Sequence, residues 1–133
     1  MKRLVFLMLL LVAEGARADS AWQASAPGPG IINLGMQLAS PPLTSPEPVS
    51  GEMTTIVWRY RLNGPAPADF RVYLCSTSRC TEIEGARGST RALYHINAAE
   101  PLHFVYGVPG TGRLNRKVQV VSNEVMVNYR PAP

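Results

Sequence analysis

The sequence predicts an all-β protein, built as a single small antiparallel β-sandwich or open barrel with one disulfide in a hairpin. Apolar and polar residues alternate with period two in several segments, as half-buried strands require. Frequent prolines and glycines, 12 and 11 of the 133 residues, separate these segments. After the N-terminus, no stretch repeats its apolar residues at helical spacing. Many short strands between turns favour a sandwich or an open barrel.

The N-terminal residues are typical of a cleaved secretory signal. A short basic start is followed by an apolar run over residues 4–13 and by the small residues Ala16 and Ala18. The run is too short to span a bilayer, which requires about 20 apolar residues. We therefore expect residues 1–18 to be removed on export and residues 19–133 to form one β domain that does not insert into a membrane. The alternative is an uncleaved anchor.

The charge balance gives no reason to expect a nucleic-acid partner. The formal charge of the chain is +4, and Lys2, Arg3, Arg17 and Glu14 together take +2 away with the signal, which leaves 4 − 2 = +2. No run of like charge remains in residues 19–133. Nucleic-acid binding requires a concentrated basic surface.

The first predicted strands lie between breaker segments. Prolines and glycines at 27–30 and prolines at 41–48 frame residues 31–39 as a short first strand. In the next strand, one face is apolar and the other is largely polar. The apolar face consists of Ile56, Trp58, Tyr60 and Leu62, and the other of Thr55, Val57, Arg59 and Arg61. Residues 63–67 then form a turn.

The later segments continue the alternation. The predicted core stripes are Phe70, Val72 and Leu74, then Ile83, then Leu102, Phe104, Tyr106 and Val108. A reversal at residues 110–112 leads to a long strand over residues 117–130. Its apolar phase slips near Ser122 and Asn123, which indicates a bulge or a switch between sheets.

The two cysteines, Cys75 and Cys80, predict a disulfide across a β-hairpin. If they are directly opposed, Val72 faces Ile83 on the apolar face and Arg71 faces Glu84 on the outer face. A shift by one residue would lose both matches. Opposed antiparallel positions suit the bond, and an exported protein meets an oxidising compartment.

Other chemistry at these residues is disfavoured. A thioredoxin-type pair has two residues between its cysteines, whereas four separate Cys75 and Cys80. Zinc would need two further ligands, and His95 and His103 are spaced too widely for a usual zinc motif. Glu82 and Glu84 share one face of a strand without a cleft between them. No nucleophile elbow or phosphate-binding loop is present. We therefore predict no metal, no cofactor and no enzymatic activity.

Two features are candidate partner-binding surfaces. Arg59, Arg61 and Arg71 are expected on the outer face of adjacent strands with Tyr73 beside them, either as a solvated sheet face or as a docking face. Trp22, near the start of the exported chain, either anchors that end in the core or is exposed as a ligand or partner contact.

An ordered series of segments resembles the FlhE family of periplasmic flagellar proteins from Gram-negative bacteria. The series comprises residues 21–23, 48–53, 57–65, the cysteine hairpin at 74–80, residues 101–110 and residues 122–130. Residues 24–48 match least well because they are richer in proline. The resemblance covers nearly all of residues 19–133.

The resemblance implies a periplasmic, chaperone-like, non-enzymatic accessory of flagellar biogenesis. Its expected partners are flagellar rod or export-gate proteins, and its expected effect is to limit proton leakage through the export apparatus. No catalytic residue carries over. The alternative hypothesis is a small carbohydrate-binding module that uses Trp22 or the arginine and tyrosine face on peptidoglycan or exported glycans. The sequence leaves the oligomeric state open, including a homo-oligomer.

Overall fold

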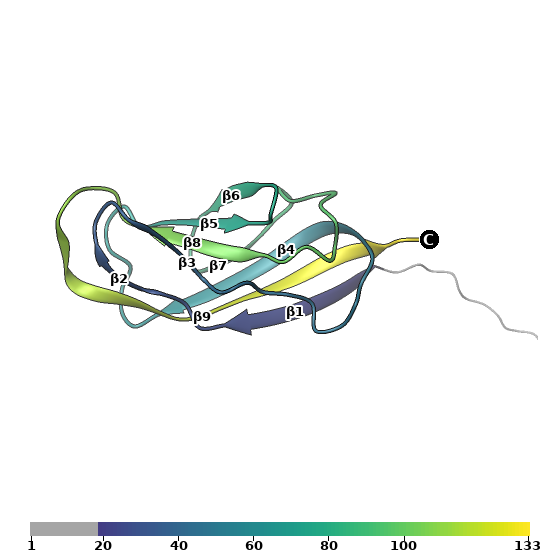
Figure 1. The fold of residues 1–133 in the computed structure, drawn as a ribbon, viewed down its shortest axis with the longest axis horizontal. Coiled ribbons are helices and arrows are strands. Elements are labelled where there is room, and N and C mark those ends of the chain that lie inside the picture. Colours follow the sequence, from purple (N-terminus) through teal and green to yellow (C-terminus); the bar gives the residue numbers. More distant parts are fainter. Residues whose placement is uncertain (1–18) are drawn as a thin grey trace, which may run out of the picture.

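The structure is a computed structural model that describes residues 19–133, and the predicted signal over residues 1–18 lies outside the described residues. The described part consists of nine strands joined by turns and loops, without a helix, which confirms the predicted fold class (Figure 1). The strands are β1 (Ser20–Ala26), β2 (Gly30–Asn33), β3 (Gln37–Ala39), β4 (Gly51–Leu62), β5 (Arg71–Cys75), β6 (Cys80–Ile83), β7 (Arg87–Thr90), β8 (His103–Gly107) and β9 (Arg113–Pro131).

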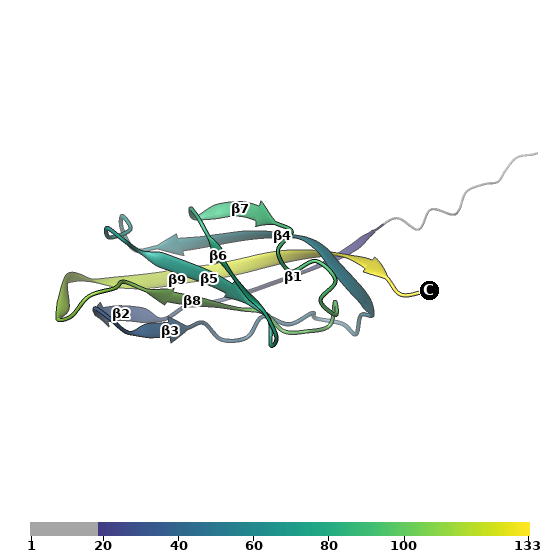
Figure 2. The same cartoon turned by 90° about the horizontal axis from the view of Figure 1, so that it is seen from above.

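The strands form two open antiparallel sheets rather than a closed barrel. The first sheet has the order β1-β9-β4-β7, and β2 also pairs with β9. The second sheet has the order β3-β8-β5-β6. The two sheets lie against one another along the long axis of the molecule (Figures 1 and 2). Of the two predicted architectures, the sandwich is therefore the one observed.

The core fills the space between the sheets with the residues that the alternation predicted. On β4, Ile56, Trp58 and Tyr60 are buried, whereas Arg59 and Arg61 are exposed. The Tyr60 ring meets two fully buried rings of β8 edge-on, with centroid distances of 6.5 Å to Phe104 and 5.6 Å to Tyr106. Since β4 and β8 belong to different sheets, these aromatic contacts join the two layers.

The long strand β9 contains the predicted bulge. Along its pairing with β4, Ser122 faces Arg61, but the next pair is Leu62 with Val120. Val121 therefore has no opposed residue on β4, and its side chain is exposed. The extra residue shifts the phase of β9, so that Val120 and Asn123 both face inward.

Asn123 is a fully buried polar residue beside this bulge, and it connects three strands. Its Oδ1 accepts a hydrogen bond of 2.9 Å from the Tyr106 hydroxyl on β8. Its Nδ2 donates to the Ala26 carbonyl at the end of β1 over 3.0 Å. A buried polar group is stable only when it is paired, and both ends of this amide are paired.

The cysteine hairpin has the predicted register. Cys75 faces Cys80 and forms a disulfide with it, and Val72 faces Ile83. The predicted pairing of Arg71 with Glu84 is wrong, because Arg71 Nη1 lies 3.9 Å from Glu82 Oε2 instead. Strand β6 ends at Ile83, and Gly85 turns the chain with a φ of 83°, so Glu84 leaves the sheet before it can face Arg71.

The predicted first strand over residues 31–39 is also wrong in its extent. It is split into β2 and β3, which belong to different sheets. Gly35 makes the turn between them with a φ of 80°, a conformation that glycine adopts readily. The true first strand, β1, was not predicted because its residues are mainly small and alternate only weakly. It forms by pairing with β9 from Ser20 opposite Tyr129 onward.

The loop of the cysteine hairpin is fixed to the segment of residues 91–100. Arg79 Nη1 donates to the carbonyls of Ala92 and Tyr94 over 3.1 Å and 3.3 Å. Thr77 Oγ1 donates to a carboxylate oxygen of Glu100 over 2.8 Å. The same segment buries Leu93 in the core. The disulfide therefore fixes a hairpin that holds a long loop against the sandwich.

We predict that replacing both cysteines by serine lowers the free energy of unfolding by about 2 kcal/mol, the chain-entropy value for so short a loop. Urea unfolding monitored by tryptophan fluorescence measures the difference. The unaltered protein with and without reductant is the control, and reductant should reproduce the loss. Equal stability of the serine variant and the oxidised protein would contradict the prediction.

The Tyr106→Phe substitution should lower the free energy of unfolding by about 1–3 kcal/mol, because it leaves the buried Asn123 Oδ1 without its donor. The matched control is Tyr94→Phe, which removes a hydroxyl from an exposed contact with Arg130 and should change stability little. Urea unfolding of the two variants compares them directly. If Tyr94→Phe lowers the free energy of unfolding as much as Tyr106→Phe does, the stabilising role of the buried Tyr106–Asn123 hydrogen bond is refuted.

Stability should fall as the pH rises above about 10, the pKa of tyrosine in an unfolded chain. Burial raises the pKa of Tyr106 and that of Tyr60, so the folded state keeps protons that the unfolded state releases above this pH. The stabilisation that these protonated tyrosines give is complete below the pKa of tyrosine in the unfolded chain and is lost progressively above it. Urea midpoints across this range test the effect, and in Tyr106→Phe the decline should be shallower. An identical slope in both proteins would be the contrary result.

Candidate functional site

The predicted docking residues divide between opposite faces of the sandwich. Arg59 and Arg61 project from β4 on the outer face of the first sheet. Arg71 and Tyr73 belong to β5 in the second sheet. The prediction that all four lie on adjacent strands is wrong, because the loop after β4 carries the chain from one sheet to the other.

The outer face of the first sheet carries a shallow hollow of about 670 Å³. Arg59 lies along it and pairs with Glu124 of β9, with a distance of 3.1 Å between Arg59 Nη2 and Glu124 Oε2. Both side chains are about half exposed, so solvent weakens the pair. Val57 and Met126 add apolar surface to the hollow. This face is a partly neutralised, solvated sheet surface.

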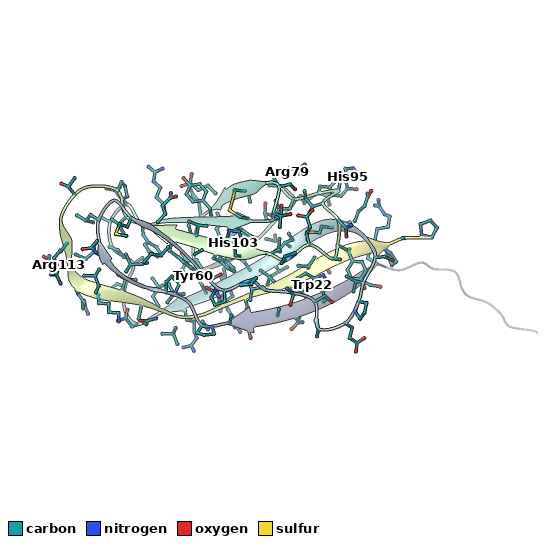
Figure 3. All side chains as sticks on the ribbon, in the orientation of Figure 1. Trp22, Tyr60, Arg79, His95, His103 and Arg113 are labelled. Carbon is teal, nitrogen blue, oxygen red and sulfur yellow. A yellow bond between two sulfur atoms is a disulfide. The ribbon has the colours of Figure 1, made fainter. Side chains whose placement is uncertain are left out.

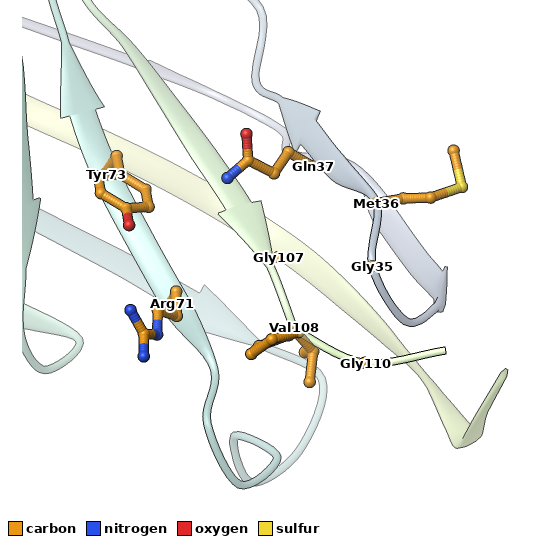
Figure 4. Close-up of a pocket in the computed structure, with 9 residues that line it drawn as sticks. Gly35, Met36, Gln37, Arg71, Tyr73, Gly107, Val108 and Gly110 are labelled. Carbon is orange, nitrogen blue, oxygen red and sulfur yellow. The ribbon is translucent and has the colours of Figure 1, made fainter. Parts of the chain in front are cut away.

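The outer face of the second sheet has a depression of about 630 Å³, into which Arg71 and Tyr73 project (Figure 4). Its floor is a cross-strand row in which Gly107 of β8 lies between Gln37 of β3 and Arg71 of β5. Gly107 has no side chain and is buried, so neighbouring atoms of Met36 and Gln37 pack close over the β8 backbone. A Cβ atom at this position would lie only 3.1 Å from the Met36 carbonyl oxygen. The depression is the candidate functional site.

The chemistry of this site suits docking. The Arg71 guanidinium is exposed and pairs only loosely with Glu82, so most of its donors face solvent. The Gln37 amide and the Tyr73 hydroxyl add donors and acceptors on either side of the glycine. Arginine and tyrosine are frequent anchors at protein interfaces, and a glycine within a strand allows another backbone to approach closely.

Arg71 and Tyr73 were predicted from the sequence as site residues, whereas Gln37, Met36 and Gly107 were not. Gly107 carried a usable signal, because a glycine within the predicted strand over residues 102–108 indicates the close approach of another backbone. Gln37 of β3 and Met36, which precedes β3, carried no such signal in the sequence. Gln37 and Met36 join the site only through the long-range pairing of β3 with β8.

Trp22 adopts the first of its two predicted roles. Its side chain is 5% exposed, and its Nε1 donates to the Ala98 carbonyl over 2.9 Å. It anchors β1 against the segment of residues 91–100 and is not available as a surface platform. The carbohydrate-binding alternative therefore loses its most suitable aromatic residue, since sugars stack on exposed rings.

A separate group of titratable residues lies at the segment of residues 91–100. His95 lies in an exposed loop, with a φ of 72°, and its Nδ1 is 2.8 Å from Glu52 Oε1. The Tyr94 hydroxyl accepts a bond of 3.4 Å from Arg130 Nη2, which lowers the pKa of this tyrosine. The Arg91 guanidinium lies 4.6 Å from the centroid of the Tyr94 ring. These contacts are exposed and hold a surface loop in place.

His103 lies apart from this group on β8, opposite Cys75 and half-buried. Both cysteines are consumed in the disulfide, so neither can bind a metal. Across residues 19–133, no three histidine, cysteine, aspartate or glutamate side chains lie close enough together to hold a metal ion. The same residues include no helix long and apolar enough to cross a bilayer.

The fold and the site define a small disulfide-bonded β-sandwich whose candidate site is an open sheet face rather than an enclosed cleft. The chain belongs to the FlhE family of flagellar proteins, whose family model, "Flagellar protein FlhE", matches residues 28–130. This confirms the resemblance found in the sequence.

Relatives and a solved structure agree with the assignment. The flagellar protein FlhE of Salmonella typhimurium is 47% identical over 130 residues, which cover 98% of this chain and all of the relative. The Escherichia coli K12 protein of the same name is 46% identical over the same coverage. A structure titled "Crystal Structure of FLHE" superposes with a TM-score of 0.83 at 51% identity, covering 84% of this chain and 97% of that one.

Proposed function

We propose that this protein is a non-enzymatic, periplasmic accessory of flagellar biogenesis that binds rod or export-gate components and limits proton leakage through the export apparatus. The single observation that carries the proposal is membership of the FlhE family over nearly the whole described chain. The predicted signal over residues 1–18 supports a location beyond the inner membrane.

The surface chemistry supports a binding role. The depression around Arg71, Tyr73 and Gly107 exposes hydrogen-bonding side chains on a sheet face, where a segment of a partner protein can lie. The lining residues include no nucleophile beside a general base, the arrangement on which most hydrolytic catalysis depends. If the protein binds its partner through this face, Arg71 and Tyr73 should be required for function.

Deletion of the gene in its own flagellated host should make the cytoplasm acidify when cells are moved to acidic medium. A pH-sensitive fluorescent protein in the cytoplasm measures this, and removal of the flagellar export gate in the same strain should abolish the leak. Cells without the gene that hold their internal pH as well as the parent would overturn the proton-leak function.

Complementation then tests the surface. A chain carrying Arg71→Glu and Tyr73→Ala should fail to restore the internal pH, because it reverses the charge of the site and removes its ring. The matched control, Arg59→Glu with Val57→Ala, changes the hollow on the opposite face and should restore it. Periplasmic fractionation of both proteins checks that each is exported and accumulates. If the variant Arg71→Glu with Tyr73→Ala fully restores the internal pH, this face is not the binding surface.

A further inference from the structure

One end of the sandwich carries a cluster of exposed basic and apolar side chains, of which only Met36 also lines the depression described above. This basic tip consists of Arg113, Arg116 and Lys117 at the start of β9, with Ile32 of β2 and Met36 of the following turn. It lies at the end of the molecule away from the C-terminus, where Arg113 is labelled (Figures 1 and 3).

Backbone pairing holds the members of the basic tip together. Asn33 of β2 faces Arg113 of β9. The turn that contains Met36 is hydrogen-bonded to the turn before β9, with Leu34 N donating to Gly112 O over 2.9 Å and Gly35 N donating to Val108 O over 2.7 Å. Two chain reversals distant in sequence thus form one surface.

The charge of this surface is unbalanced. The turns and strand ends that build it, residues 30–38, 63–70 and 108–118, contain three basic residues and one acidic residue, Asp69. None of the three basic side chains lies in an ion pair within residues 19–133, whereas Arg59 and Arg71 each have a carboxylate partner. This end of the described chain therefore carries three cations against one carboxylate and is net positive.

The apolar members identify the kind of partner. Met36 is 50% exposed and Ile32 is 38% exposed, among the few large apolar side chains of the described residues that face solvent. Exposed apolar side chains beside arginine and lysine are typical of surfaces that sit at the headgroup boundary of a membrane. The basic groups meet lipid phosphates there, and the apolar groups reach the acyl boundary.

We infer that the basic tip docks reversibly onto a bilayer surface rich in anionic phospholipid, without insertion of any strand. The three cations are spread over a strand end and do not converge on one point, so an extended anionic surface fits them better than an acidic peptide, which is bound most specifically by bidentate arginines. With three cations and two apolar side chains, binding should be weak and should decrease with added salt. The inference is independent of the proposed function.

The test uses residues 19–133 as a purified, oxidised protein and vesicles of phosphatidylcholine with or without phosphatidylglycerol. Sedimentation at low salt should show binding to the anionic vesicles only, and high salt should release the protein. The triple variant Arg113→Gln, Arg116→Gln and Lys117→Gln should bind on the order of a hundredfold more weakly, from the contribution of each basic residue near a membrane.

A second triple variant, Arg59→Gln, Arg87→Gln and Arg91→Gln, has the same net charge and alters exposed residues outside the basic tip. It should bind like the unaltered protein. Absence of binding by the unaltered protein, equal binding to both vesicle types, or equal losses in the two triple variants would each overturn the inference. Circular dichroism establishes that every variant is folded.

The apolar pair separates a lipid surface from an acidic protein. The variant Ile32→Ser and Met36→Ser should lose several-fold in vesicle binding and nothing in binding to soluble polyglutamate. If the unaltered protein binds polyglutamate as tightly as it binds vesicles, and the serine variant still binds vesicles fully, the partner is an acidic protein and the lipid assignment fails.

Discussion

The buried hydrogen bond from the Tyr106 hydroxyl to Asn123 joins the two sheets at the point where the long strand β9 changes its partner. Asn123 lies beside the bulge of β9, at the junction where this strand changes partners along one edge. On one side of the junction β9 pairs with β1, and on the other side it pairs with β2. The same amide also caps the end of β1 through the Ala26 carbonyl. The two hydrogen bonds of this one side chain therefore join the longest strand to the end of β1 and to the facing sheet.

The link between β1 and β2 passes close to β9 at this junction. Gly28 donates its backbone N–H to Val120 over 3.0 Å, and a Cβ atom there would lie 2.4 Å from a methyl carbon of Val120. Only glycine allows the link between β1 and β2 to pass so close to β9. The proline and glycine segment that appeared in the sequence as a simple strand boundary is thus a close crossing over the bulge.

Local patterns predicted the parts of this fold that depend on neighbours in sequence. The alternation on β4 and β8 placed the core residues correctly, and the opposed cysteines gave the register of β5 with β6. The errors arose where pairing is long-range. Strand β1 has little propensity of its own, and residues 31–39 were divided between sheets by contacts with β8 and β9. The candidate site was half predicted for the same reason: β5 supplied recognisable residues, whereas Gln37 and Met36 arrive through β3.

Both ends of the described chain lie side by side, since Ser20 pairs with Tyr129 across the edge of the first sheet. In Figure 3, which has the orientation of Figure 1, this end is opposite the end of the molecule where Arg113 is labelled. A label or an immobilising tag fused after Pro133 would therefore project away from the Arg113 end and leave both sheet faces uncovered. The protein can therefore be immobilised or labelled at its C-terminus while the two sheet faces and the basic tip remain accessible to a partner.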